Sequence, residues 1–156
     1  MRPNGVKLSR RHRTWVYSIF LLAFFSGFTR IILRYAIPKS LQIGNVVHVL
    51  KLLALKVHGA AAMLVLVILG TLIPLHMKRG WTVKLNRSNG IVLISVNLGL
   101  ITTGYLLYYA GGETFRNISS WIHMTLGVLL PGFLVWHIAE GRLSRKKRQL
   151  SKNFNS

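Results

Sequence analysis

The segment from Trp121 to Gly141 reads WIHMTLGVLLPGFLVWHIAEG, and the interpretation of the whole chain depends on it. Its apolar length is close to the roughly 20 residues that a helix needs to cross about 30 Å of hydrocarbon. It nevertheless carries a histidine near each end, His123 and His137. An ionisable side chain is costly within a bilayer and is usually retained for a function. The segment therefore predicts a membrane-spanning helix whose two imidazoles have a role.

Three further apolar segments of similar length precede this one. The four predicted spans cover residues 15–37, 58–76, 90–110 and 121–138. The basic leader before the first span suits a signal peptide, but the long apolar run, its two arginines and the lack of a small-residue cleavage site favour a retained span. We therefore predict an all-α fold, an integral membrane four-helix bundle within residues 15–141. Basic tails at 1–14 and 142–156 flank it.

The charges are distributed unevenly along the chain. Lys and Arg number 21, against only two acids, Glu113 and Glu140. Fifteen of the 21 cations lie in the two tails and in the loop between the second and third spans. Since cytoplasmic segments of membrane proteins are enriched in Lys and Arg, both termini are predicted to be cytoplasmic. We expect a multi-pass protein of a bacterial or archaeal cytoplasmic (inner) membrane, whose basic tails contact lipid rather than nucleic acid.

Four of the six histidines lie at the ends of two predicted helices. His58 and His76 are eighteen residues apart, a whole number of turns, and His123 and His137 are fourteen apart, which leaves them about 40° from a common face. Because the second and fourth spans run in the same direction, His58 is expected at the level of His123, and His76 at that of His137.

Two facing imidazoles are the axial ligands of a six-coordinate haem. The chain has no cysteine, which excludes thiolate ligands and a covalently attached haem, so the group would be haem b. His12 in the tail and His48 in the outer segment are expected not to be ligands, although His48 is the substitute if His58 is not one. The unequal spacings leave a mismatch of about 6 Å. Kinks at Pro74 and Pro131, or a wrong choice of one ligand, would account for it.

From about Trp15 to Gly141 the chain resembles small di-haem cytochrome b membrane proteins, which include cytochrome b561 and the cytochrome b subunits of respiratory formate dehydrogenases and hydrogenases. The resemblance rests on His123-x3-Gly127 with His137, Ile138 and Gly141, and on KVHGAAAM at the start of a span that closes at His76. It implies two bis-histidine b haems and electron transfer across the membrane between a quinone pool and a partner redox subunit. That partner would be a multihaem cytochrome c, an Fe–S protein or another oxidoreductase subunit of a larger complex.

Other residues could also contribute to haem or quinone binding, and most of them have a second possible role. Glycines in the two histidine-bearing spans would make room for a porphyrin: Gly59, Gly70, Gly127 and Gly132. Arg30 and Arg34 would pair with haem propionates or else reach the outer headgroups, and Lys78 and Arg79 would do the same at the inner level. A quinone is a further candidate ligand. Polar residues of the third span would line its pocket or would be packing contacts: Asn97, Thr102, Thr103, Tyr105, Tyr108 and Tyr109.

Two questions stay open at this point. Residues 41–57 form either an amphipathic helix on the outer surface, which we favour, or an outward extension of the second span. The chain is either the electron carrier described above or a haem-free membrane anchor or assembly subunit. A metal-ion transporter is disfavoured because carboxylates are nearly absent. Since no catalytic acid pair or nucleophile is recognisable, quinol oxidation or quinone reduction would be its only reaction.

Overall fold

The computed structural model describes residues 9–38, 45–78, 81 and 87–153, and these residues are almost entirely helical. The elements in chain order are α1 (Arg10–Tyr35), α2 (Asn45–Leu72), the short π-helix η2 (Ile73–Met77), α4 (Arg87–Tyr109) and α5 (Glu113–Asn153). Five cations of the tail and loops lie outside the described residues: Arg2, Lys7, Lys39, Arg79 and Lys84.

Each of the four long helices contains an apolar stretch long enough to cross a membrane. The all-helical fold and the four candidate spans are therefore confirmed for the described part of the chain. Insertion into a bilayer, the cytoplasmic side of the termini and the assembly of the helices into one bundle stay predictions.

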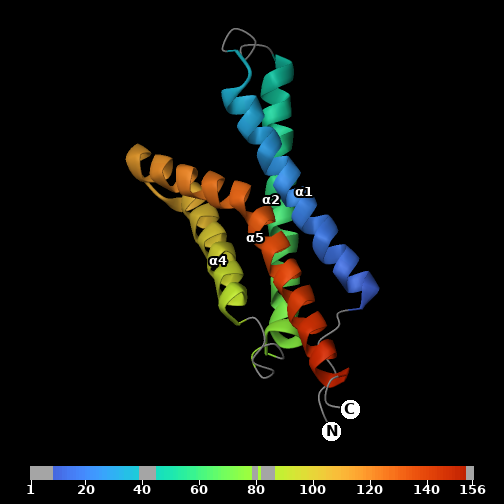
Figure 1. The fold of residues 1–156 in the computed structure, drawn as a ribbon. Helices are drawn as coiled ribbons and strands as arrows, with labels where there is room; N and C mark the ends of the chain where they lie inside the picture. Colours follow the sequence, from blue (N-terminus) through green and yellow to red (C-terminus); the bar gives the residue numbers. More distant parts are fainter. Residues whose placement is uncertain (1–8, 39–44, 79–80, 82–86, 154–156) are drawn as a thin grey trace. The chain divides into compact units, whose positions relative to one another are not determined.

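The helices associate as two antiparallel pairs (Figure 1). The chain divides into two compact units, Met1–His76 and Met77–Ser156. α1 packs against α2 in the first unit, and α4 packs against α5 in the second. Each predicted pair of ligands takes one histidine from each unit.

The first unit has a small apolar core between its two helices. Val16 and Ile19 of α1 are buried against Ile68 of α2, with Val65 and Leu72 packed around them. Val16 and Ile19 are three residues apart and therefore lie on one face of α1. Most other large apolar side chains of α1 and α2 are exposed, as expected for helices that contact lipid or further helices.

The second helix differs from the sequence prediction at both ends. Residues 45–57 continue into the second span without a break, so the surface helix that we favoured is wrong and the outward extension is confirmed. At the other end, η2 contains Pro74 and His76. A π turn rotates the residues that follow by roughly one position relative to an uninterrupted helix. The common face inferred for His58 and His76 assumed an uninterrupted helix and does not carry over.

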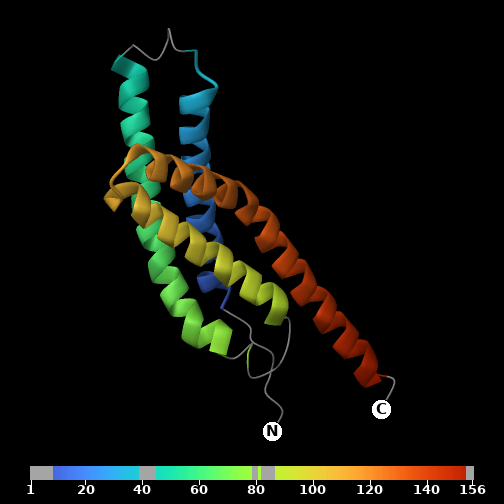
Figure 2. The same ribbon diagram turned by 90° about the vertical axis from the view of Figure 1, so that its left-hand side faces the viewer.

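The last helix is longer than its predicted span and is bent. α5 begins at Glu113, so most of the predicted outer loop is helical, and it continues far into the basic tail. Figure 2 shows a bend in the middle of α5, which has Pro131 in its interior. Proline has no N–H to donate to the carbonyl group four residues earlier, and this is a common cause of such bends.

The contacts between α4 and α5 keep one antiparallel register. A Cβ atom added at Gly99 of α4 would lie 2.9 Å from Leu126 of α5, and one added at Gly127 of α5 would lie 3.9 Å from Leu100 of α4. Thr103 of α4 contacts His123 of α5, and Asn89, fourteen residues earlier on α4, contacts His137, fourteen residues later on α5. This antiparallel register relates the polar contacts between α4 and α5 that are described below.

Cysteine cross-linking tests the register in a chain that has no cysteine of its own. We expect the double variant Gly99→Cys/Leu126→Cys to form an intramolecular disulfide under mild oxidation, because the two side chains meet. In Gly99→Cys/Val128→Cys the second thiol lies about 200° around α5, and Val128 is exposed. Equal cross-linking of both variants on non-reducing gels would contradict the register.

Candidate functional site

His123 extends from α5 to α4 and is held there by a hydroxyl group. Its Nδ1 atom lies 2.9 Å from the Oγ1 atom of Thr103, which is buried. The Thr103 hydroxyl donates its own hydrogen to the carbonyl oxygen of Gly99 at 2.7 Å. Its oxygen therefore accepts the hydrogen of Nδ1–H, which assigns the imidazole tautomer.

His137 makes the equivalent contact at the other end of α4. Its Nδ1 atom lies 3.1 Å from the Oδ1 atom of Asn89, a residue only 4% exposed. A carboxamide oxygen accepts hydrogen bonds and cannot donate. His137 Nδ1 is therefore the donor, as in His123.

His58 of α2 follows the same rule in the other unit. Its Nδ1 atom donates to the main-chain carbonyl oxygen of Ala23 at 2.9 Å and lies 3.2 Å from the buried Ser26 hydroxyl, both on α1. Ser26 in turn donates to the carbonyl of Leu22 at 2.7 Å. Arg30 lies four residues after Ser26, one turn further along α1.

A glycine follows each polar acceptor and lies against the ring. The three dipeptides are Ser26-Gly27 facing His58, Asn89-Gly90 facing His137 and Thr103-Gly104 facing His123. A Cβ atom added to the glycine would lie 2.8 Å from His58, 3.4 Å from His123 and 3.9 Å from His137. We use the term histidine seat for such a polar residue with its following glycine.

The three seats share one chemical result. In a neutral imidazole with its hydrogen on Nδ1, the lone pair is on Nε2. Metal-binding histidines characteristically donate one ring N–H to a protein acceptor and coordinate through the other nitrogen. The donor set at His58, His123 and His137 therefore fits axial coordination of haem iron.

The two units place their histidines at equal separations. His123 and His137 are fourteen residues apart on α5, and their acceptors Thr103 and Asn89 are fourteen apart on α4. A ligand role for His76, the second predicted ligand of the first unit, stays a prediction. His76, eighteen residues from His58, lies within the π turn.

His12, which was expected not to be a ligand, lies within reach of α2. It lies on α1, where Ser9 caps the helix by accepting from the His12 main-chain N–H at 3.2 Å. Its ring Nε2 atom lies 3.5 Å from the Thr71 hydroxyl of α2, at the limit for a hydrogen bond. His12 is fourteen residues from Ser26 on α1, and Thr71 is thirteen from His58 on α2. The levels of His12 and His58 are thus about 20 Å apart, as are those of His123 and His137.

The other predicted site residues have varied positions. Arg30 is half-buried, whereas Arg34 is exposed and stacks on the Tyr35 ring at 5.4 Å. Gly59 is half-buried beside His58, and Gly127 packs against Leu100 of α4. Gly70 and Gly132 have open space where a side chain would be. A role for these residues in haem binding stays a prediction.

Four of the residues predicted to line a quinone pocket or to pack between helices have contacts in α4, and a quinone pocket stays a prediction. Thr103 holds His123, and Asn97 donates to the carbonyl oxygen of Leu93 at 2.8 Å. Tyr105 and Tyr109 are exposed and stacked, with ring centroids 4.5 Å apart. Among the described residues, no cluster of three or more His, Cys, Asp or Glu side chains could hold a metal ion.

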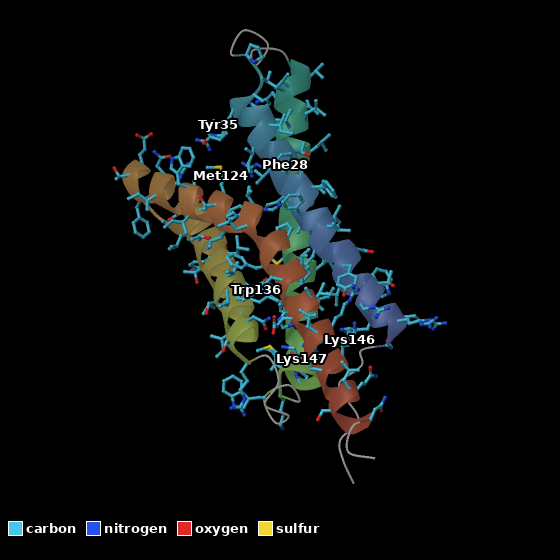
Figure 3. The ribbon with its side chains drawn as sticks, viewed as in Figure 1. Phe28, Tyr35, Met124, Trp136, Lys146 and Lys147 are labelled. Carbon is cyan, nitrogen blue, oxygen red and sulfur yellow. The ribbon has the colours of Figure 1, made fainter. Side chains whose placement is uncertain are left out.

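Sequence analysis missed Ser26, Asn89, Gly27, Gly90, Gly104 and His12 as site residues. The signal for the seats was present as a polar residue followed by glycine, at positions fourteen apart on the span without histidine. Figure 3 labels Met124 and Trp136, the sequence neighbours of His123 and His137, on the two arms of α5. Comparison with protein-family models, curated proteins and solved structures finds no match to the chain. The resemblance to cytochrome b proteins therefore rests on the sequence pattern.

The Thr103 seat makes a prediction for the protein without any cofactor. In Thr103→Val the buried Nδ1–H of His123 loses its acceptor, at a cost of about 1–3 kcal/mol. We expect ring 15N chemical shifts of His123 to change from one tautomer to a mixture, and Thr103→Ser to restore the single tautomer. Thr102→Val, at the exposed neighbouring position, is the control. A single unchanged tautomer in Thr103→Val would show that the seat does not orient the ring.

Proposed function

We propose that the chain is a di-haem b-type cytochrome subunit of a membrane redox complex. It would carry electrons across the bilayer between a quinone pool and a partner redox protein. The observation that carries the proposal is the shared orientation of three imidazoles, each with Nδ1–H bonded to the neighbouring helix and the lone pair on Nε2. When bound, haem supplies reversible one-electron chemistry that no side chain of this protein provides.

The outer haem would be held by His58 and His123, and the inner one by His137 and His12. Within the first unit the levels of His12 and His58 are about as far apart as those of His123 and His137 within the second, and this similarity favours His12 over the predicted His76 as the fourth ligand. His12 contacts Thr71 through Nε2, whereas the other three imidazoles contact the neighbouring helix through Nδ1. His76 stays the alternative.

The chain's own residues have three tasks in this proposal. The seats orient each imidazole and strengthen its basicity by accepting from Nδ1–H. The apolar helices exclude water and keep the dielectric constant around the site low. Arg30, half-buried and one turn from the His58 seat, supplies positive charge for a propionate.

A haem-free anchor subunit is the alternative, in which the histidines serve only to pair the helices. Hydrogen bonds between membrane helices contribute about 0.6 kcal/mol on average. Bonds of this size support helix pairing in either role. A packing role does not require that all three rings donate through Nδ1, whereas a ligand role does, because it needs the lone pair on Nε2.

Haem content of purified variants tests the proposal directly. We expect a red protein with a Soret band and about two haems per chain by pyridine haemochrome assay. His123→Ala and His12→Ala should each lose about half of the haem, whereas His48→Ala and His76→Ala should lose none. Loss in His76→Ala with none in His12→Ala would restore the sequence-based assignment. A colourless, fully folded protein would exclude the function and favour the anchor.

The seat glycines form a graded series for the same assay. Gly27→Ala would place a Cβ atom 2.8 Å from the His58 ring, closer than real contacts allow, whereas Gly90→Ala makes an ordinary contact at 3.9 Å with His137. We expect Gly27→Ala to reduce occupancy of the His58 haem or shift its reduction potential, Gly104→Ala to have a smaller effect, and Gly90→Ala to behave as wild type. Gly70→Ala, in open space, is the control; equal effects at all four positions would contradict ring contact as the cause.

A further inference from the structure

The last helix extends well beyond its partner. In the register of the second unit, Arg87, the first residue of α4, is level with Ala139 of α5. Residues 140–153 therefore have no part of α4 beside them, and at 1.5 Å per residue they extend about 21 Å further. Figures 1 and 2 both show α5 continuing past this end of α4. We refer to residues 140–153 as the basic extension.

The basic extension is strongly cationic. Its only acid is Glu140 at its base, and its cations are Arg142, Arg145, Lys146, Lys147, Arg148 and Lys152. The described side chains among them are exposed, and Figure 3 shows Lys146 and Lys147 further along α5 than Trp136. Like charges this close repel one another, so an opposite charge from outside the helix would stabilise it.

The basic extension also carries an apolar stripe. Leu143 and Leu150 are 54% and 50% exposed. They are seven residues apart, close to two turns, and therefore lie on one face of the helix. A pair of leucines at this spacing is how one helix packs along another. The basic extension thus presents apolar side chains as well as cations to its surroundings.

We propose that the basic extension is a docking helix for an acidic, amphipathic helix of a partner protein. Its leucines would pack against the apolar face of that helix, and its lysines and arginines would pair with the flanking carboxylates. The inference uses the membrane insertion of α5 from the proposed function, but does not require that haem is bound.

The geometry favours a protein over a lipid surface as the occupant. A helix that lies on headgroups must break from the span that precedes it, but α5 is one unbroken helix through Gly141 to Asn153. A continuous helix carries its later turns away from the phosphates. At physiological ionic strength charges are screened over about 8 Å. The first turn of the basic extension would reach headgroup charge, and the turns around Leu150 would not.

A nitroxide label measures where the basic extension lies. The full-length chain has no cysteine, so Ser151→Cys gives a single labelling site. In vesicles of phosphatidylcholine, with or without phosphatidylglycerol, we expect the label to be equally accessible to a water-soluble nickel relaxant. Protection that appears only with phosphatidylglycerol, together with access to oxygen, would place the helix on the anionic membrane and overturn the proposal.

A designed peptide measures docking. The probe is a helical peptide of about three heptads with leucine at the a and d positions and glutamate elsewhere; its lysine counterpart is the control. We expect the acidic peptide to bind the reconstituted protein, more weakly as salt rises. Leu143→Ser/Leu150→Ser and Lys146→Glu/Lys147→Glu should each weaken binding at least about threefold. Arg10→Glu/Arg11→Glu, with the same change of net charge on α1, should not.

Equal binding of the acidic and lysine peptides, or equal weakening by the α1 variant, would overturn the docking proposal. Haem content measured on the same samples separates the two proposals. A red protein that fails to bind the peptide refutes docking alone, and a colourless protein that binds it refutes the haem assignment alone.

Discussion

The hydrogen bond from imidazole Nδ1–H to an acceptor on the neighbouring helix is the constraint on which this structure depends. Within a bilayer the hydrophobic effect does not bring helices together, so close packing and a few polar contacts determine their register. Thr103 and Asn89 each accept one such bond, and together they allow α4 and α5 a single alignment. The same bonds assign the lone pair of each imidazole to Nε2. One interaction thus sets both the register of a helix pair and the chemistry that its histidines can perform.

A separation of fourteen residues recurs because it is close to a whole number of helical turns. Fourteen residues are close to four turns, so side chains at both ends lie on nearly one face about 21 Å apart. In the second unit both histidines come from α5, whereas in the first unit His58 comes from α2 and His12 from α1. The distance along the helix axis between His12 and His58 still agrees with that between His123 and His137. This is because residues that contact each other in an antiparallel pair lie at the same height along the axis. A separation of eighteen residues that includes the π turn at Ile73–Met77 keeps neither the face nor the distance.

How much the sequence predicts depends on how local the signal is. The four spans follow from hydropathy, since a helix satisfies its own backbone in an apolar medium. His58, His123 and His137 were recognised because their spacing is a property of one helix. The seats at Ser26, Thr103 and Asn89 were missed because they depend on the register between two helices, which no single-helix pattern contains. His12 was assigned to a tail because the apolar segment that predicts the first span begins only at Trp15, whereas the helix itself begins at Arg10.

The packing between the two histidine levels holds them apart. In the first unit the core of Val16, Ile19 and Ile68 lies between the level of His12 and that of His58. In the second unit the Gly99–Leu126 contact lies between His123 and His137, and the bend of α5 falls in the same interval. A change in this packing would alter the separation of the levels without touching a histidine or its acceptor. The apolar contacts between the two levels therefore set their separation, and in the proposed cytochrome they would also set the distance between its two haems.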